Sequence, residues 1–334
     1  TQGEATFDAN RPDRNLPPWV FWTTSTQPGH SGWRFGKSPN PGPRHLRVGF
    51  TEPTDVGTVI VRGDVTLSFL KPEATYPGDL GNDDHWQSAE RLRESEIAVW
   101  VLPPDTQTRA LRFTADQAPH PTAVSYSGQV AGVYVLPQRY VNIAPAAAVI
   151  TSHSMDESAR IVNGRQESWW DPWDTGRDGA EYAVSPEHPQ SVILYWPQPI
   201  DLAGIATLWA VFGDAEVQVY TGPADRHPRE APPAQWRTLD RRTFKHYYPM
   251  GLPIVPVGFD RPATTRAVRI RMLGPAEEYS HVRGKTADGK RVWLGELLAL
   301  HAIGEKPAET VKLPGDEVAL HPPIPIQFTL DRDA

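Results

Sequence analysis

A tryptophan-rich stretch in the second half of the chain carries residue types well suited to bind a ligand. Three tryptophans fall within five residues and are interleaved with carboxylates, and an arginine follows. The residues are Trp169, Trp170, Asp171, Trp173, Asp174 and Arg177. An indole face stacks on the apolar C–H groups of a sugar, while charged side chains bind its hydroxyl groups. The stretch indicates a carbohydrate platform with Trp169 and Trp173 as stacking residues; alternatively, the tryptophans pack in or cap the core.

A second loop combines aromatic and basic side chains at His246, Tyr247 and Tyr248. Two phenol rings and an imidazole offer the same stacking and hydrogen-bonding groups as the tryptophan-rich stretch. This loop is therefore a second candidate for contact with the ligand.

Catalytic motifs are missing from the sequence. It has no Gly-x-Ser-x-Gly elbow, no glycine-rich phosphate loop, and no pair among its eleven histidines at i,i+4 spacing. It has no cysteine, which excludes a thiolate zinc site, a cysteine nucleophile and a disulfide framework. Acidic pairs such as Asp83 and Asp84 are explained by turns and solvated loops. The sequence therefore favours binding over catalysis.

The composition sets the class of protein. The 334 residues include 35 Pro and 26 Gly, which argues against a mostly helical chain, and 32 aromatic residues, which argue against disorder. The net charge of −7 argues against a general nucleic-acid binder. No apolar run has the length of about 18 residues that a membrane span requires.

Short alternating runs between the prolines and glycines predict the elements that position these residues. Strands are expected at 46–50, 56–61, 97–102, 110–114, 130–136, 192–196, 217–221 and 267–273. The stretch from Ser88 to Glu96 is the best candidate for a short helix. Many short strands separated by turns predict an all-β sandwich or barrel.

An internal repeat predicts two domains. TRALRF at 108–113 corresponds to TRAVRI at 265–270, and residues 50–59 correspond to 196–205. Trp86 and Trp236 follow polar loops at equivalent places. We expect one β domain over 1–145, its copy over 146–304, and a Pro-rich linker over 305–334. The alternating run 326–330 predicts the first strand of a further domain; alternatively, the tail packs on the second domain.

The second copy resembles a known family over residues 150–304. Asn163-Gly164 is followed by Ser168 and Trp170, then by a strand-like stretch over 191–208, by RAVRI and by Gly295-Glu296-Leu297. This order is similar to that of discoidin-type (coagulation factor 5/8 type C) domains. The resemblance implies two tandem galactose-binding-like β-sandwiches of the jelly-roll type. The first copy matches only from about Phe50 and has Val133 where Glu296 would fall.

The resemblance also implies a structural calcium ion. Its ligands would include the amide oxygen of Asn163, the hydroxyl of Ser168 and the carboxylate of Glu296, the hard oxygen ligands that calcium prefers. The alternative is that Asn163 and Ser168 make turn hydrogen bonds and that Glu296 lies at a strand edge.

Together these features predict a non-catalytic carbohydrate- or glycan-binding region of a larger secreted protein. The expected partners are a carbohydrate or glycoconjugate and further domains of the same polypeptide, with no nucleic acid and no membrane span. The expected location is secreted, periplasmic or cell-surface. The chain begins TQGEAT without Met, as a mature form or a piece of a longer chain does. The alternatives are a spacer or protein-interaction module of an exported protein, and a fragment of a carbohydrate-active enzyme.

Overall fold

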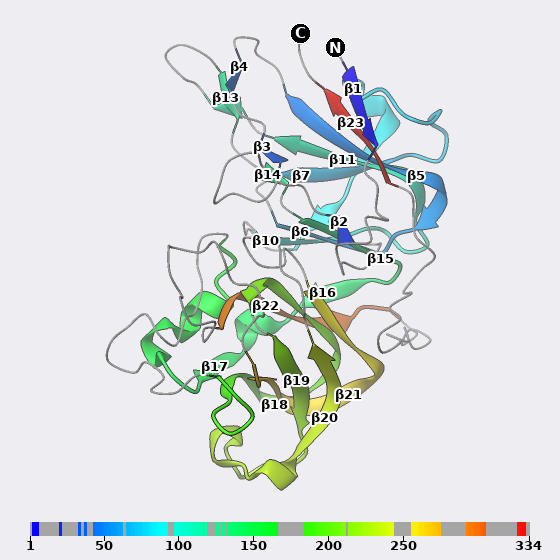
Figure 1. Cartoon of the computed structure of the whole chain (residues 1–334). Coiled ribbons are helices and arrows are strands. Elements are labelled where there is room, and N and C mark those ends of the chain that lie inside the picture. Colours follow the sequence, from blue (N-terminus) through cyan, green and yellow to red (C-terminus); the bar gives the residue numbers. More distant parts are fainter. Residues whose placement is uncertain are drawn as a thin grey trace. The chain divides into compact units, whose positions relative to one another are not determined.

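The computed structural model divides the chain into two compact units. Unit 1 comprises Thr1–Tyr140 with Asp316–Ala334, and unit 2 comprises Val141–Gly315. Nearly all regular structure in both is β-strand, which confirms the all-β prediction (Figure 1). The structure describes residues 2–6, 20–21, 33–34, 37–38, 43–62, 65–92, 97–115, 117–118, 124–126, 129–130, 132–165, 184–211, 213–243, 255–274, 292–304 and 326–331.

Unit 1 contains a six-stranded and a five-stranded antiparallel sheet. The larger sheet has the order β1 (Gln2–Thr6), β23 (Ile326–Asp331), β5 (Arg44–Asp55), β11 (Gln107–Ala115), β7 (Thr66–Leu70) and β8 (Trp86–Ser88). The other has the order β2 (Val20–Phe21), β15 (Gly132–Leu136), β6 (Thr58–Arg62), β10 (Ile97–Val101) and β9 (Glu90–Arg91). Small sheets join β12 (Gln117–Ala118), β13 (Val124–Tyr126) and β4 (Lys37–Ser38), and β14 (Gln129–Val130) and β3 (Trp33–Arg34).

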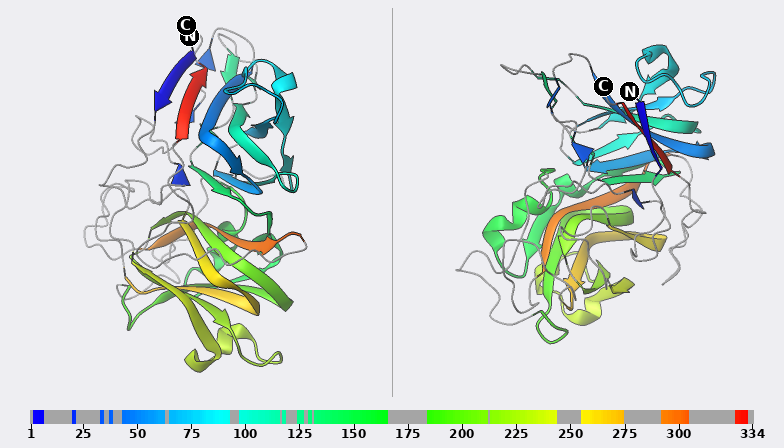
Figure 2. Two further views of the ribbon diagram at one scale, coloured as in Figure 1. Left: turned by 90° about the vertical axis from the view of Figure 1, so that its right-hand side faces the viewer. Right: turned by 45° about the horizontal axis from the view of Figure 1, so that its top comes forward.

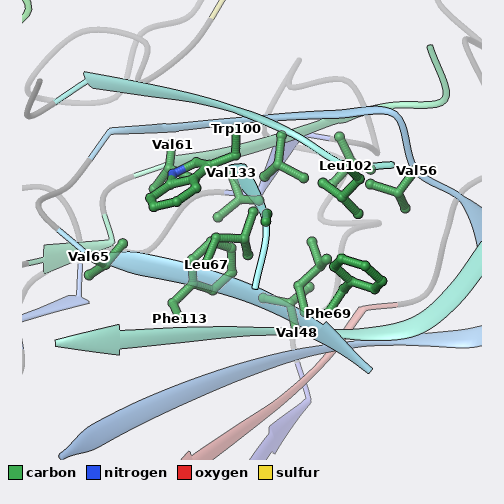
Figure 3. Packing of buried hydrophobic residues seen from close by; sticks show 14 of the residues in the cluster. Val48, Val56, Val61, Val65, Leu67, Phe69, Trp100, Leu102, Phe113 and Val133 are labelled. Atoms are coloured by element: carbon green, nitrogen blue, oxygen red, sulfur yellow. The ribbon is translucent and has the colours of Figure 1, made fainter. Parts of the chain in front are cut away.

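The core of unit 1 is formed by side chains from both of its main sheets. In β5, Leu46, Val48 and Phe50 alternate along one face and are buried. They pack in one cluster with residues of the other sheet, among them Trp100 and Val133 (Figure 3). Alternate residues of a strand point to opposite faces, so these strands bury one face against the facing sheet. Unit 1 is therefore a β-sandwich.

The C-terminal strand β23 completes the larger sheet of unit 1. Ile326 pairs with Phe50 of β5, and Asp331 pairs with Gln2 of β1, so the strand lies between them. Figure 2 shows β23 (red) beside β1 (blue). The sequence predicts a strand here that begins a further domain or packs on the second domain. In the structure it belongs to unit 1, because its free backbone groups are satisfied by β1 and β5.

Unit 2 is built around two long strands. These two strands, β18 (Gln190–Val211) and β21 (Val255–Met272), are paired antiparallel along most of their length, and their register shifts between Tyr195 and Ile200. Pro197 and Pro199 lie at this break and have no N–H to donate to the ladder. The strands are β16 (Tyr140–Asn142), β22 (Trp293–Ala302), β18 (Gln190–Val211), β21 (Val255–Met272), β19 (Asp214–Tyr220) and β20 (Trp236–Thr243), with β17 (Ala148–Thr151) paired to β18.

Helical structure in the described part of the chain consists of single 3-10 segments. They are η1 (Asp83–His85), η2 (Ala144–Ala146), η3 (Met155–Ile161), η4 (Pro228–Glu230) and η5 (Pro233–Gln235). The short helix expected from Ser88 is wrong at its start, because Ser88 ends β8 and Glu90–Arg91 form β9.

The same local frame occurs in both units at the repeated sequence. Thr108 donates its hydroxyl to Leu70 O at 2.9 Å and accepts the amide of Ala110 at 3.3 Å. Thr265 makes the equivalent bonds to Tyr220 O at 2.9 Å and from Ala267 at 3.2 Å.

The arginine four residues after each threonine is also placed alike. Arg112 Nε donates to Ser68 at 2.9 Å, and its guanidinium lies 5.1 Å from the ring centroid of Trp86. Arg269 Nε donates to Gln218 at 2.8 Å and its guanidinium lies 4.1 Å from the centroid of Trp236. Burial lowers the pKa of Arg269 to about 10, with a smaller contribution from nearby Arg271.

Candidate ligand-binding site

A cavity of about 920 Å³ lies at one end of the unit 1 sandwich. Its walls come from the β5–β6 turn, the loop after β7, the β10–β11 turn with the start of β11, and the turn after β15. Backbone at strand ends is held by the sheets, whereas the side chains on the connecting loops are available for contacts. The lining residues are Pro53, Asp55, Val56, Gly57, Leu70, Lys71, Pro72, Ala74, Tyr76, Asp105, Thr106, Gln107, Thr108, Arg109, Pro137, Gln138 and Arg139.

Gly57 fixes the turn after β15 against the β5–β6 turn. Its amide donates to Leu136 O at 2.9 Å, and its carbonyl accepts the amide of Leu102 at 3.0 Å. A Cβ at this position would lie 2.4 Å from the backbone carbon of Gln138, so only glycine fits. The two turns therefore form one rigid wall of the cavity.

Tyr140 anchors the other end of this wall. Its hydroxyl donates to Gln138 Oε1 at 2.8 Å, and its amide donates to the hydroxyl of Thr58 at 2.7 Å. Burial raises the pKa of Tyr140 from 10.0 to about 12, so the phenol stays neutral well into the alkaline range. A neutral phenol keeps the donor that holds the Gln138 side chain.

Arg109 and Tyr76 form an amphipathic surface in the cavity. The Arg109 guanidinium lies 4.1 Å from the centroid of the Tyr76 ring, and both side chains are half-buried. Tyr76 packs against a buried cluster formed by Leu70, Leu80, Trp86 and Ala110, which restricts its position. Because the guanidinium lies over the ring, it covers one ring face, and the pair offers planar hydrogen-bond donors next to the remaining apolar surface of the ring.

Further polar groups stand around the same cavity. Gln107 Nε2 donates to Asp55 Oδ1 at 2.8 Å, and both side chains are exposed. Lys71 Nζ donates to Asp84 O at 2.8 Å, and Arg139 Nε donates to Leu102 O at 3.0 Å. The cavity thus combines one aromatic face with several donors and acceptors at separate positions, as sites for polar small molecules do.

Unit 2 has related groups at the equivalent corner. Asp201 Oδ1 accepts from the hydroxyl of Thr264 at 2.6 Å, as Asp55 accepts from Gln107 in unit 1. Arg266 follows Thr265 as Arg109 follows Thr108, and its guanidinium lies 5.3 Å from the centroid of the Tyr195 ring. The polar pair therefore occurs in both units, and each arginine contacts a tyrosine, which comes from the loop after β7 in unit 1 and from β18 in unit 2.

The structure brings two of the three expected calcium ligands into one region. Glu296 is 1% exposed, and its carboxylate oxygens lie 3.1 and 3.0 Å from the amide of Gly164, which donates to them. The side-chain oxygen of Asn163 accepts the amide of Arg165 at 3.0 Å, which is a turn bond of the kind that the alternative interpretation expects. Ser168 lies outside the described residues.

Asn163 and Glu296 supply the kind of oxygen ligand that calcium prefers, but they supply fewer ligands than calcium needs. A buried carboxylate and an amide oxygen are hard oxygen ligands, but calcium takes six to eight of them. Within the described ranges no group of three or more His, Cys, Asp or Glu residues is placed to hold a metal. Calcium at Glu296 therefore stays a prediction.

The aromatic loops expected to bind sugar are not among the described residues. The residues concerned are Trp169, Asp171, Trp173, Asp174, Arg177, His246, Tyr247 and Tyr248, and their role stays a prediction. Sequence reasoning missed the cavity of unit 1, although two of its residues carry a signal. Arg109 belongs to the repeated TRALRF segment, and Asp55 lies in the repeated stretch 50–59.

Comparison with known proteins finds similarity at the level of solved structures. No protein-family model and no curated protein matches the sequence. Over about half its length the chain is similar to discoidin-like domains and carbohydrate-binding modules.

Three of these structures illustrate the match. The family 32 carbohydrate-binding module of NanJ from C. perfringens, in complex with galactose, is 14% identical, with 48% of this chain and 99% of that chain covered and a TM-score of 0.34. Chitosan-binding module 1 from a chitosanase/glucanase of Paenibacillus sp. IK-5 is 16% identical, with 48% and 98% covered and a TM-score of 0.32. An F5/8 type C domain from Bacteroides fragilis is 14% identical, with 49% and 97% covered and a TM-score of 0.31.

A search of the described residues for membrane-spanning helices finds none that is long and apolar enough.

Proposed function

We propose that this chain is a non-catalytic carbohydrate-binding protein and that the cavity of unit 1 is a sugar site. The observation that carries the proposal is the Arg109–Tyr76 surface, which is fixed by packing and opens on a cavity of about 920 Å³. A pyranose ring presents an apolar C–H face and a rim of hydroxyl groups. The phenol ring matches the first and the surrounding donors and acceptors match the second.

The polar groups of the cavity suit hydroxyl recognition because they both donate and accept. The carboxylate of Asp55 accepts, the amide of Gln107 donates and accepts, and the hydroxyl of Thr106 does both. Thr106 now donates to Pro103 O at 2.7 Å, so it can still accept from a ligand. These donors and acceptors can bind vicinal hydroxyl groups of a sugar, and binding of this kind needs no catalytic residue.

We infer as well that the two units are diverged copies of one domain. The support is the shared frame around Thr108 and Thr265 together with the corresponding arginine–aromatic contacts. In this view the polar corner of unit 2 is a former or weaker ligand site. The predicted aromatic platform around Trp173 would then be a separate sugar contact of unit 2.

We further propose the context in which such a chain works. A sugar-binding region acts on extracellular or cell-surface glycans, which supports a secreted, periplasmic or cell-surface location and attachment to further domains. The buried Glu296 beside the Asn163-Gly164 turn supports a structural calcium in unit 2.

Binding to a glycan microarray that carries neutral, amino and acidic oligosaccharides tests the function. We expect the whole chain to be retained by a defined set of glycans and Gln107→Ala to weaken that binding. Gln87→Ala is the matched control, because Gln87 is an exposed glutamine on β8 that does not line the cavity. A chain that binds no glycan, or two variants with equal binding, would refute the proposal.

A further inference from the structure

The unit 1 cavity is lined by more cationic than anionic side chains, which indicates the class of sugar that it binds. Three cations line it, Lys71, Arg109 and Arg139, against two carboxylates, Asp55 and Asp105. The whole chain has a net charge of −7, so the sign of the cavity is opposite to that of the protein. A local excess of cations in an acidic chain marks a place that attracts an anion.

Two of these cations are held by backbone carbonyl groups rather than by carboxylates. Lys71 Nζ contacts Asp84 O, and Arg139 Nε contacts Leu102 O. Within the described residues neither side chain forms an ion pair. An ammonium has three donors and a guanidinium five, so each keeps N–H groups and a full charge for a ligand.

Burial strengthens the cations relative to the carboxylates. Lys71 and Arg139 are half-buried, whereas Asp55 and Asp105 are exposed. Water screens an exposed charge more than a partly buried one, so the two carboxylates repel an incoming anion less than the cations attract it. The carboxylate of Asp55 is further occupied by the amide of Gln107.

We propose that the ligand of this cavity is an acidic saccharide, with a uronate carboxylate bound by Lys71 and Arg139. The proposal rests on the proposed sugar-binding function and deepens it. The terminal nitrogens of a guanidinium match the two oxygens of a carboxylate, while an ammonium adds a point charge. Tyr76, over whose ring the Arg109 guanidinium lies, lines the same cavity and would contact the sugar ring.

Calorimetric titration of the whole chain with tetragalacturonate tests the proposal, with a neutral galactose tetrasaccharide and a sulfated one as comparisons. We expect the uronate to bind about tenfold or more tighter than the neutral sugar. Its affinity should fall as ionic strength rises from about 0.01 M to about 0.15 M, since the Debye length shortens from about 30 Å to about 8 Å.

Three charge-neutralising variants locate the effect. Lys71→Gln and Arg139→Gln should each weaken uronate binding about three- to tenfold and weaken neutral-sugar binding by a smaller factor. Arg237→Gln is the matched control, because Arg237 is an exposed arginine on β20 of unit 2. Thermal unfolding of each variant shows that the fold is retained, and the Lys71 variant carries the test if the Arg139 variant unfolds.

The outcomes separate the two proposals. Neutral sugar bound as tightly as the uronate, or uronate affinity unchanged by Lys71→Gln, overturns the acidic-sugar inference and leaves sugar binding intact. Sulfated sugar bound as tightly as the uronate overturns the assignment of the anion to a carboxylate. Failure of every saccharide to bind overturns the proposed function itself.

Discussion

Replacing Thr108 by valine tests whether its hydroxyl holds the cavity frame of unit 1. Thr108 is 3% exposed and lies where the β5–β11 register shifts, between Thr108 and Ala110. The hydroxyl donates to Leu70 O and accepts from Ala110 N, so it adds hydrogen bonds to two buried backbone groups beside the shift. Valine has nearly the same shape and cannot make either bond.

The cost follows from the two buried hydrogen bonds that are lost. A buried donor or acceptor that loses its partner costs about 1–3 kcal/mol, and two such groups with partial relaxation give about 2–3 kcal/mol. This corresponds to roughly a 30- to 150-fold rise in the population of the opened unit. Thr66→Val is the control, because the Thr66 hydroxyl is exposed and contacts Thr114 O only at 3.4 Å. We expect it to change stability by less than about 0.5 kcal/mol.

Hydrogen exchange followed by mass spectrometry measures the effect in each unit separately. In Thr108→Val, peptides from β5 and β11 should exchange faster by the factor given above, while those from β21 of unit 2 keep their protection. Thr265→Val should produce the reverse pattern, since Thr265 makes the equivalent bonds in unit 2. The reasoning fails if Thr108→Val behaves like Thr66→Val.

Four further predictions follow from other parts of the structure. Gly57→Ala should lower the stability of unit 1 by about 1–3 kcal/mol in urea unfolding, because its Cβ would meet the Gln138 backbone, while Gly81→Ala, with its nearest neighbour at 3.7 Å, should change little. The free energy of unfolding should fall as pH rises from 10.0 towards about 12, because an unfolded tyrosine ionises there while folded Tyr140 stays neutral, and Tyr140→Phe should remove this loss. Deletion of 316–334 removes the strand between β1 and β5 and should speed hydrogen exchange in unit 1 and not in unit 2. Calcium should raise the melting temperature of unit 2 in the wild type and not in Glu296→Gln; an identical response of both proteins to EDTA would contradict the calcium proposal.

The sequence was a good guide to local strands because their signal is local. The alternation of Val268 and Ile270 with Arg269 and Arg271 predicts a strand with one buried face, and β21 has that pattern. The register break in β18 could be read only in part, since Pro197 and Pro199 look like the end of one strand and the structure continues through them. A local pattern cannot show that hydrogen bonding resumes beyond a proline.

Long-range features escaped the sequence for a different reason. The strand β23 pairs with β5, which lies almost the whole chain away in sequence. Nothing within residues 326–330 indicates which strand they pair with. The cavity likewise gathers side chains from four separate turns, whose meeting is set by Gly57 and by the sheets. The contact between Gly164 and Glu296 was within reach of the sequence, because both residues were named by a resemblance that already contains the long-range pairing, whereas calcium binding there stays a prediction.

One difference between the two repeated frames bears on where a ligand binds. Leu70 and Tyr220 occupy equivalent positions, because each provides the carbonyl that accepts from the repeated threonine. The Tyr220 hydroxyl donates to Pro223 O at 2.9 Å, and a Cβ on Gly222 would lie 2.4 Å from that hydroxyl, so the following loop lies directly on the ring. Leu70 has no polar atom to bind its loop, and it lines the cavity instead. The same frame thus supports a closed loop over a tyrosine in unit 2 and an open cavity beside a leucine in unit 1, which is why we propose a ligand site at this corner for unit 1.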